Sequence, residues 1–222
     1  STQSRSSAAS DVYKRQNIIR KPFRYSFFNA TSIIIALNLI VFFLTMIFPR
    51  LQVYLGMSYF GILLHYYWQP LTYLFVHSGW SHILFNMLAL FFFGISVERA
   101  VGSKEFLLFY FLCGILDGII STVLYRLLGI TVLLVGASGA VYALLFAYAV
   151  IFPRNVIYIW GIIPVAAPLL VFVYALIEIT SQISGGSGIA HLAHLAGFAV
   201  AWIYFVARMG IHPLKVWKDA WR

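Results

Sequence analysis

Six long apolar stretches, separated by short polar or aromatic segments, follow the first 28 residues of the chain. Each is close to the roughly 20 residues that an α-helix needs to cross a bilayer. The pattern therefore predicts six membrane-spanning helices, at about residues 30–48, 80–97, 104–126, 134–152, 156–178 and 189–208. We expect them to form one all-α bundle, with a bend at Pro164 and Pro168 in the fifth span.

Composition supports this interpretation, because 62% of the 222 residues are hydrophobic and only 9% are charged. These values lie well outside the range of soluble globular domains and indicate a multi-pass membrane protein. The single cysteine, Cys113, cannot form an internal disulfide. The net charge of +9 is interpreted as a signal of membrane orientation, and we expect no nucleic-acid partner.

The basic residues are distributed asymmetrically between the two sides of the predicted bundle. Six precede the first span, two follow the second, one follows the fourth and four end the chain, so 13 of the 15 Lys and Arg residues fall on one side. Only Arg50 and Arg126 fall on the other. Because cytoplasmic loops are enriched in Lys and Arg, both termini are predicted to be cytoplasmic, in the cell (inner) membrane.

Three segments are predicted along the chain. Residues 1–28 are expected to be a flexible basic tail, 29–208 the helical core, and 209–222 a basic tail that rests on the inner membrane surface. Within the core, the aromatic loop 49–79 is expected to lie partly in the outer leaflet. The Gly-rich stretch 181–188 is expected to be a mobile outer lid.

Several polar side chains occur early in the three spans that enter from the outer face. His82 and Asn86 begin the second span, Ser138 the fourth, and His191 and His194 the sixth. At about 1.5 Å per residue, all lie on the order of 3–12 Å below the outer boundary. Polar groups within lipid are costly and normally face the bundle interior, so this common depth predicts a site.

The chemistry that fits is acyl transfer by an activated serine. The hydroxyl of Ser138 needs a base, and His194 is assigned that role. We assign oxyanion binding to His82 and Asn86, which share a helical face, together with the backbone at Ser138 and Gly136. Three further residues are expected to support the site: Tyr142, Gly139 and Gly197. Tyr142 is expected to pack its ring on His194.

These residues also allow other interpretations. Small residues such as Gly136 and Gly139 also serve helix packing. His191 and His194 could form a metal pair, but no carboxylate or further Cys or His accompanies them in the sequence, so we expect neither metal nor cofactor. Four residues are expected to have no catalytic role: His65 and His77 as solvent or headgroup contacts, and Glu105 and Glu178 as charges near span ends.

Three motifs resemble those of rhomboid intramembrane serine proteases: Gly136-Ala137-Ser138-Gly139, Ala193-His194-Leu195-Ala196-Gly197 and His82-Ile83-Leu84-Phe85-Asn86. The stretch 97–103 is also similar to the segment after the family's second helix. The resemblance implies a six-helix rhomboid core with a Ser138–His194 dyad. Because a dyad has no third catalytic residue, Asp117 is expected to form a structural hydrogen bond. The family's Trp-Arg pair is Trp68-Gln69 here, and two family glycines are Ala143 and Ala201.

The resemblance further implies cleavage of single-span membrane proteins near the outer face. We expect a water-filled cavity above the second, fourth and sixth spans, and a movable fifth span that admits the substrate. The alternatives are a catalytically inactive rhomboid-like protein that binds membrane clients, and a small transporter. The sequence assigns no oligomeric state.

Overall fold

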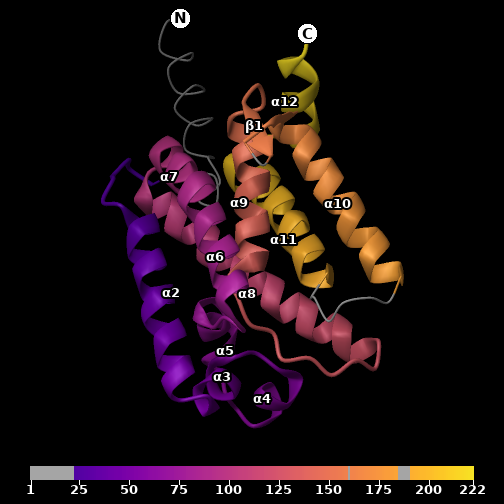
Figure 1. Ribbon diagram of the computed structural model, residues 1–222. Helices are drawn as coiled ribbons and strands as arrows, with labels where there is room; N and C mark the ends of the chain where they lie inside the picture. The colour runs from indigo at the N-terminus through magenta and orange to yellow at the C-terminus, as the bar shows by residue number, and fades with distance from the viewer. Residues whose placement is uncertain (1–22, 160, 185–190) are drawn as a thin grey trace, which may run out of the picture.

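The computed structural model describes residues 23–159, 161–184 and 191–222, which form a bundle of helices (Figure 1). The predicted basic tail therefore lies largely outside the described residues, as does half of the predicted lid, residues 185–188. The elements are, in order: α2 Ala30–Ile47, α3 Arg50–Leu55, α4 Tyr59–Leu63, α5 Gln69–Thr72, η2 Tyr73–Phe75, α6 Trp80–Ala89, η3 Leu90–Gly94, α7 Ile95–Val101, α8 Ser103–Leu127, α9 Ser138–Ile151, β1 Val156–Ile159, β2 Ile163–Ala166, α10 Ala167–Ser184, α11 His191–Tyr204, η4 Phe205–Met209 and α12 Pro213–Ala220.

Five helices are long and apolar enough to cross a membrane, where α6, η3 and α7 count as one and α11 and η4 as another. The prediction of an all-α membrane bundle is confirmed, and four of the six predicted spans match observed helices closely. Large apolar side chains remain exposed along α2, α8 and α10, as expected for surfaces that face lipid. The chain is thus an integral multi-pass membrane protein.

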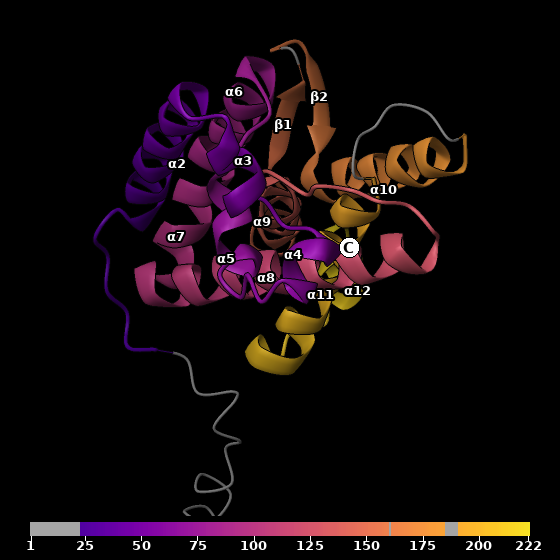
Figure 2. The same cartoon turned by 90° about the horizontal axis from the view of Figure 1, so that it is seen from below.

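The fourth predicted span, α9, is shorter than the others, at 14 residues or about 21 Å. It occupies the centre of the bundle when the molecule is viewed from the end that carries α3, α4 and α5 (Figure 2). Ten of its residues are buried. Because other helices surround α9, it does not need the length of a helix that faces lipid.

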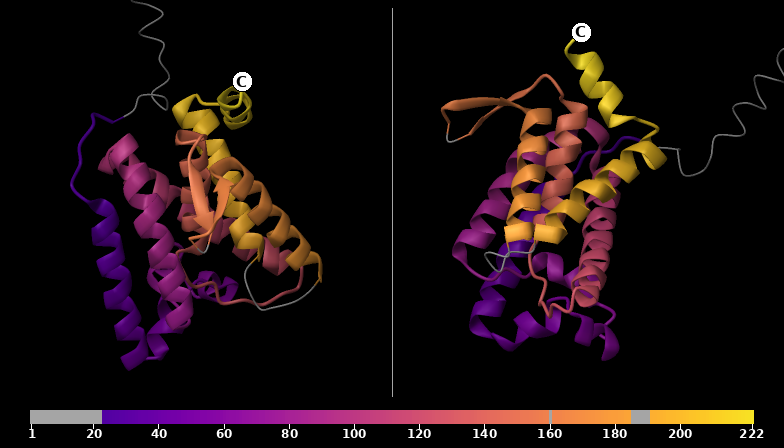
Figure 3. Two further views of the ribbon diagram at one scale, coloured as in Figure 1. Left: turned by 45° about the horizontal axis from the view of Figure 1, so that its top comes forward. Right: turned by 90° about the vertical axis from the view of Figure 1, so that its right-hand side faces the viewer.

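The predicted fifth span is wrong in its first half. Strands β1 and β2 form an antiparallel hairpin in which Val156 pairs with Ala166 and Ile159 with Ile163, and this hairpin projects beside α10 (Figure 3). Gly161 has a φ of 71° at the turn, a conformation that favours glycine. Pro164 lies in β2 and Pro168 in the first turn of α10, so neither proline bends the middle of a helix.

The loop that precedes α6 is held by the side chain of Gln69, which is 1% exposed. Its amide nitrogen donates to the backbone oxygens of Val53 and Tyr54 at 3.3 and 3.2 Å, and its oxygen accepts from the Ser58 N–H at 3.2 Å. Trp68 donates from Nε1 to the same Tyr54 oxygen at 3.0 Å. The Trp68-Gln69 pair therefore braces the loop without a positive charge.

Glu98 closes the opposite end of the bundle by holding the start of α2. Its carboxylate accepts from the N–H groups of Ala30 and Thr31 at 2.6 and 2.9 Å, and from the Thr31 hydroxyl at 2.7 Å. Ser103 also donates to it, at 2.5 Å. The first N–H groups of a helix lack partners within the helix, so a buried carboxylate at this position satisfies them and complements the helix dipole.

Replacing Glu98 by Ala should destabilise the fold by about 3 kcal/mol, because buried donors lose a charged acceptor. Thermal unfolding in detergent micelles measures the effect. Glu98→Gln retains one carbonyl oxygen and should give an intermediate loss. A Glu98→Ala variant that unfolds at the wild-type temperature would show that the carboxylate does not hold α2.

The C-terminal helix α12 packs against the bundle, and its place on the inner membrane surface stays a prediction. Trp217 is buried and donates from Nε1 to the Ala149 oxygen at 2.9 Å. Its ring lies against Phe146 and Phe172, at centroid distances of 5.5 and 5.4 Å. The second tryptophan of the segment, Trp221, is exposed.

Candidate functional site

The predicted site residues come from three helices that begin at the end of the bundle where α3, α4 and α5 lie (Figure 1). His82 and Asn86 lie on α6, Ser138 is the first residue of α9, and His191 and His194 open α11. The segment before α9 is tied to the loop between α2 and α6, because Met57 and Leu134 exchange backbone hydrogen bonds at 2.9 and 2.7 Å.

Two glycines let α9 pack closely against its neighbours, Gly197 at the contact with α11 and Gly139 at the contact with α8. A methyl group on Gly197 would overlap the carbonyl oxygen of Gly139, and one on Gly139 would overlap the carboxylate of Asp117. Ala143 and Ala201, which replace two family glycines, are fully buried. The small side chains therefore let two helix backbones touch beside Ser138, so helix packing accounts for Gly139 and Gly197.

His194 is held by the ring of Tyr142. The two rings are stacked with a centroid distance of 4.1 Å and an angle of 8° between their planes. Ser138 lies one helical turn before Tyr142 and so shares its face of α9. Ser138 is half-buried, and its hydroxyl forms no hydrogen bond with the described residues. Catalytic hydrogen bonds are often long or misaligned before substrate binds.

Gly136 shapes the approach to the serine. Its φ of 112° favours glycine, and its N–H donates to the Tyr73 oxygen at 2.9 Å. A side chain here would also collide with Cε1 and Nε2 of His82. Because Gly136 has no side chain, the His82 imidazole can lie against the segment that precedes Ser138.

The hydrogen bonds of His82 fix which nitrogen carries its proton. The backbone N–H of Ser78 lies 3.4 Å from His82 Nδ1, and the Ser78 hydroxyl lies 3.0 Å from it. A backbone N–H can only donate, so Nδ1 is the acceptor and Nε2 carries the hydrogen. The Nε2–H beside Gly136 is then a donor. Asn86, one turn further on, is buried and uses one amide hydrogen on the His82 oxygen at 2.9 Å.

Glu178 joins the two histidines of α11, contrary to the prediction that its charge lies near a span end without a role. It is 4% exposed. Its Oε2 lies 2.5 Å from Nδ1 of His191, and its Oε1 lies 2.9 Å from Nδ1 of His194. The latter is an ion-pair contact, since His194 Nδ1 is not aligned for a hydrogen bond. The hydroxyl of Tyr142 also donates to Oε1.

The remaining candidates separate into structural and surface residues. Asp117 accepts from the hydroxyls of Tyr73 at 3.3 Å and Ser121 at 3.4 Å, as a structural residue would. His65 is exposed. His77 was expected to contact solvent but is 3% exposed, and its ring meets the His82 ring edge-on at 5.0 Å. Burial, with a smaller effect of His82, lowers the pKa of His77 to about 3, so it stays neutral.

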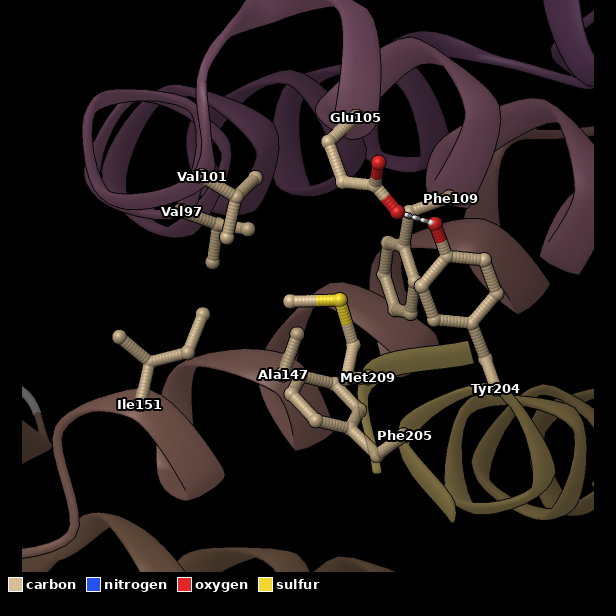
Figure 4. A pocket seen from close by; sticks show the side chains of 9 residues that line it. All are labelled: Val97, Val101, Glu105, Phe109, Ala147, Ile151, Tyr204, Phe205 and Met209. Atoms are coloured by element: carbon tan, nitrogen blue, oxygen red, sulfur yellow. Dashed lines mark hydrogen bonds between the residues drawn. The ribbon is translucent and has the colours of Figure 1, made fainter. Parts of the chain in front are cut away.

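Glu178, His191 and His194 could together hold a metal ion, since their ligand atoms lie within 4.8 Å of one another. Glu178 thus provides the carboxylate that is missing from the sequence around the two histidines. The expected water-filled cavity stays a prediction. One described cavity lies between α7, α8, α9 and α11 beside Glu105 (Figure 4), and another lies between α4 and the end of α8; neither is lined by Ser138 or His194.

Fold and site together define a multi-pass helical membrane protein with a serine and a histidine on two helices in close contact. Comparison with protein families matches the Rhomboid domain over residues 64–210. The chain belongs to the rhomboid family.

Relatives with descriptive names are found in plants, bacteria and animals. "RHOMBOID-like protein 12, mitochondrial" from Arabidopsis thaliana is 34% identical over 155 residues, which cover 60% of this chain and 44% of the relative. "Rhomboid protease GluP" from Bacillus subtilis is 40% identical over 79 residues, or 36% of this chain and 15% of the relative. "Rhomboid-related protein 2" from Mus musculus is 31% identical over 137 residues, or 59% and 44%. The chain thus spans less than half the length of each.

Proposed function

We propose that this chain is an intramembrane serine endopeptidase that cleaves single-span membrane proteins near the outer face. Ser138 is the nucleophile and His194 the base. The observation that carries the proposal is the Tyr142 ring stacked on His194, one helical turn from Ser138, where Gly197 lets the backbones of α9 and α11 touch. The name of the bacterial relative GluP, a rhomboid protease, supports the same function.

The reaction begins when the Ser138 oxygen attacks the scissile carbonyl and its proton passes to His194. The negative charge on the carbonyl oxygen is stabilised by the Nε2–H of His82, the amide of Asn86 and the backbone N–H of Ser138, and Gly136 keeps this space open. His194 then gives the proton to the leaving amine. Water hydrolyses the acyl-enzyme in the second half of the reaction, with His194 again as base.

The asymmetry of Lys and Arg supports cytoplasmic termini, with the site open to the outer face. Because α10 carries many exposed apolar side chains, it is the segment we propose to move aside when a substrate helix enters. Cross-linking α10 to α6 should then block cleavage of a membrane substrate. Full activity after cross-linking would exclude this route of entry.

Reconstitution into lipid vesicles with a tagged single-span protein tests the function. We expect two fragments, produced by a cut near the outer end of the span, and none with Ser138→Ala. The main alternative, an inactive rhomboid-like protein that binds membrane clients, predicts that the substrate is captured but remains intact.

A further inference from the structure

The cavity between α4 and the end of α8 takes no part in the proposed reaction. It is lined by residues of α4, the last two turns of α8 and the loop 129–132 that follows. Its volume is about 400 Å³. Sites that bind small molecules have volumes of roughly 300–1,000 Å³, so this cavity is large enough to hold a ligand.

Arg126 supplies the positive charge of this cavity. It is exposed in the last turn of α8, a helix long and apolar enough to cross a membrane. Its guanidinium carbon lies 5.1 Å from the centre of the Tyr59 ring, and this contact holds the planar group at the cavity. Arg126 forms no ion pair with a carboxylate in the part of the chain that the structure describes. Its charge is therefore available to an anion.

The walls around this charge are apolar. Phe60 and Leu63 on α4 are 58 and 56% exposed, and Ile130 in the loop is 43% exposed. An arginine at the end of a membrane helix places its charge at the level of the lipid headgroups. A cation at that level, beside apolar side chains, complements both parts of a phospholipid, the phosphate and the acyl chain.

Thr122 adds a polar group without a partner. It lines the same cavity and is 2% exposed, and its hydroxyl has no hydrogen-bond partner among residues 23–159, 161–184 and 191–222. Burying a hydroxyl without a partner costs stability. A threonine on a helix has two accessible χ1 rotamers, so a rotation of this side chain would let the hydroxyl bind a polar ligand in the cavity.

We propose that this cavity binds one anionic phospholipid from the leaflet at this end of the bundle. Arg126 holds the phosphate, and an acyl chain lies against Phe60 and Leu63. The planar guanidinium can donate two parallel hydrogen bonds to phosphate oxygens. Of the two basic residues that the sequence places on this side, Arg50 and Arg126, only Arg126 lines this cavity. The proposal concerns lipid binding and does not depend on the proposed function.

The loop that lines the cavity continues toward Ser138 (Figure 1). Residues 130–132 line the cavity, and Leu134 then exchanges backbone hydrogen bonds with Met57. A lipid that contacts both α4 and this loop therefore braces the segment that precedes α9. Because a ligand stabilises the folded state that binds it, phosphatidylglycerol should raise the unfolding temperature of the wild-type protein in detergent. An unfolding temperature that does not rise would overturn the proposal.

The main experiment titrates delipidated protein in a non-ionic detergent with phosphatidylglycerol and counts bound lipids by native mass spectrometry. We expect one saturable site, and Arg126→Gln should weaken it at least about 10-fold, because a charge-assisted contact with the phosphate is lost. The matched control is Arg50→Gln, which removes the same charge from an exposed position on α3 at the same end. It should bind within about 2-fold of the wild type, since a distant exposed charge is screened. Wild-type binding by Arg126→Gln would overturn the proposal.

A second variant tests the cavity itself. Thr131 is exposed and lines the cavity, so Thr131→Trp should fill the space while Arg126 stays in place. We expect phosphatidylglycerol binding to fall at least about 10-fold, because the ligand and the indole compete for one volume. Unchanged binding would show that the lipid lies elsewhere and would contradict the proposal.

Further titrations identify the occupant. Phosphatidylcholine with the same acyl chains should bind at least about 10-fold more weakly, because its choline cancels the net charge of the phosphate. Equal binding of the two lipids would refute recognition of an anion. Glycerol 3-phosphate, which has no acyl chain, should not displace the lipid; displacement at equal concentration would mean a site for free phosphate. A dimer that replaces the lipid adduct would mean that a second copy of the chain covers the cavity, and would likewise refute the proposal.

Discussion

Replacing Ser138 by Ala is expected to lower kcat/KM for a single-span substrate by at least about 10⁴-fold, and His194→Ala by a similar factor. The alanine variant of Ser138 lacks the attacking oxygen, and without His194 the hydroxyl remains a weak nucleophile. Because the two act as a unit, the double variant should be about as inactive as either single one. Rates of fragment formation in lipid vesicles measure all three.

The chain offers matched controls for both substitutions. Ser184 is exposed at the end of α10, and His65 is exposed in the loop between α4 and α5. Ser184→Ala and His65→Ala should retain cleavage within about 2-fold, since both side chains are exposed and neither belongs to the proposed site. The proposed mechanism fails if Ser138→Ala still cleaves at more than about a hundredth of the wild-type rate.

Replacing Glu105 by Ala is expected to give the largest loss of stability, about 3–5 kcal/mol. Its carboxylate is 3% exposed and binds Arg208 through Nε at 2.9 Å and one terminal nitrogen at 2.8 Å. Tyr204 donates to it at 2.5 Å (Figure 4). Its loss removes the anion that compensates a largely buried guanidinium, and it breaks the link between the start of α8 and the end of α11. Chemical or thermal unfolding in detergent measures the loss.

A second ion pair in the same chain provides the control. Arg222 lies 3.9 Å from Asp219, and their side chains are 68 and 50% exposed. Pairs screened by water contribute little, so Asp219→Ala should leave stability nearly unchanged. Equal effects of Glu105→Ala and Asp219→Ala would show that burial does not strengthen the pair with Arg208.

Much of the fold follows from the hydrophobic pattern alone. A helix that faces lipid must be apolar over about 20 residues, so α2, α8 and the helix that starts at Trp80 can be located within a few residues. The common depth of His82, Ser138 and His194 is also visible in the sequence. It follows from the positions of these residues at the starts of spans that run in the same direction.

The sequence misleads where an apolar run contains two kinds of element. Residues 156–178 are apolar except for Glu178, so the pattern predicts one helix, although β-branched residues around Gly161 and two prolines are typical of a hairpin such as the one observed. Because the predicted span ends too early, the burial of Glu178 cannot be recognised from the sequence. In a span that ends at residue 178 the charge reaches the surface, but in α10 it lies on the buried face, seven residues after Val171.

Tertiary contacts decide the remaining differences. His77 looks like a surface residue because it lies in the loop 49–79, yet the fold places its ring against His82. The bracing by Gln69 likewise depends on backbone oxygens that lie 15 and 16 residues away in sequence. Neither contact leaves a periodic signal in the sequence.

The central claim is that the base on α11 activates one hydroxyl, that of Ser138. The most direct test is to incubate the purified protein with a fluorophosphonate and to locate the adduct by peptide mass spectrometry. We predict one adduct, on Ser138, which is absent after His194→Ala. Wild-type protein that stays unlabelled, or that is labelled equally with and without His194, would contradict the claim.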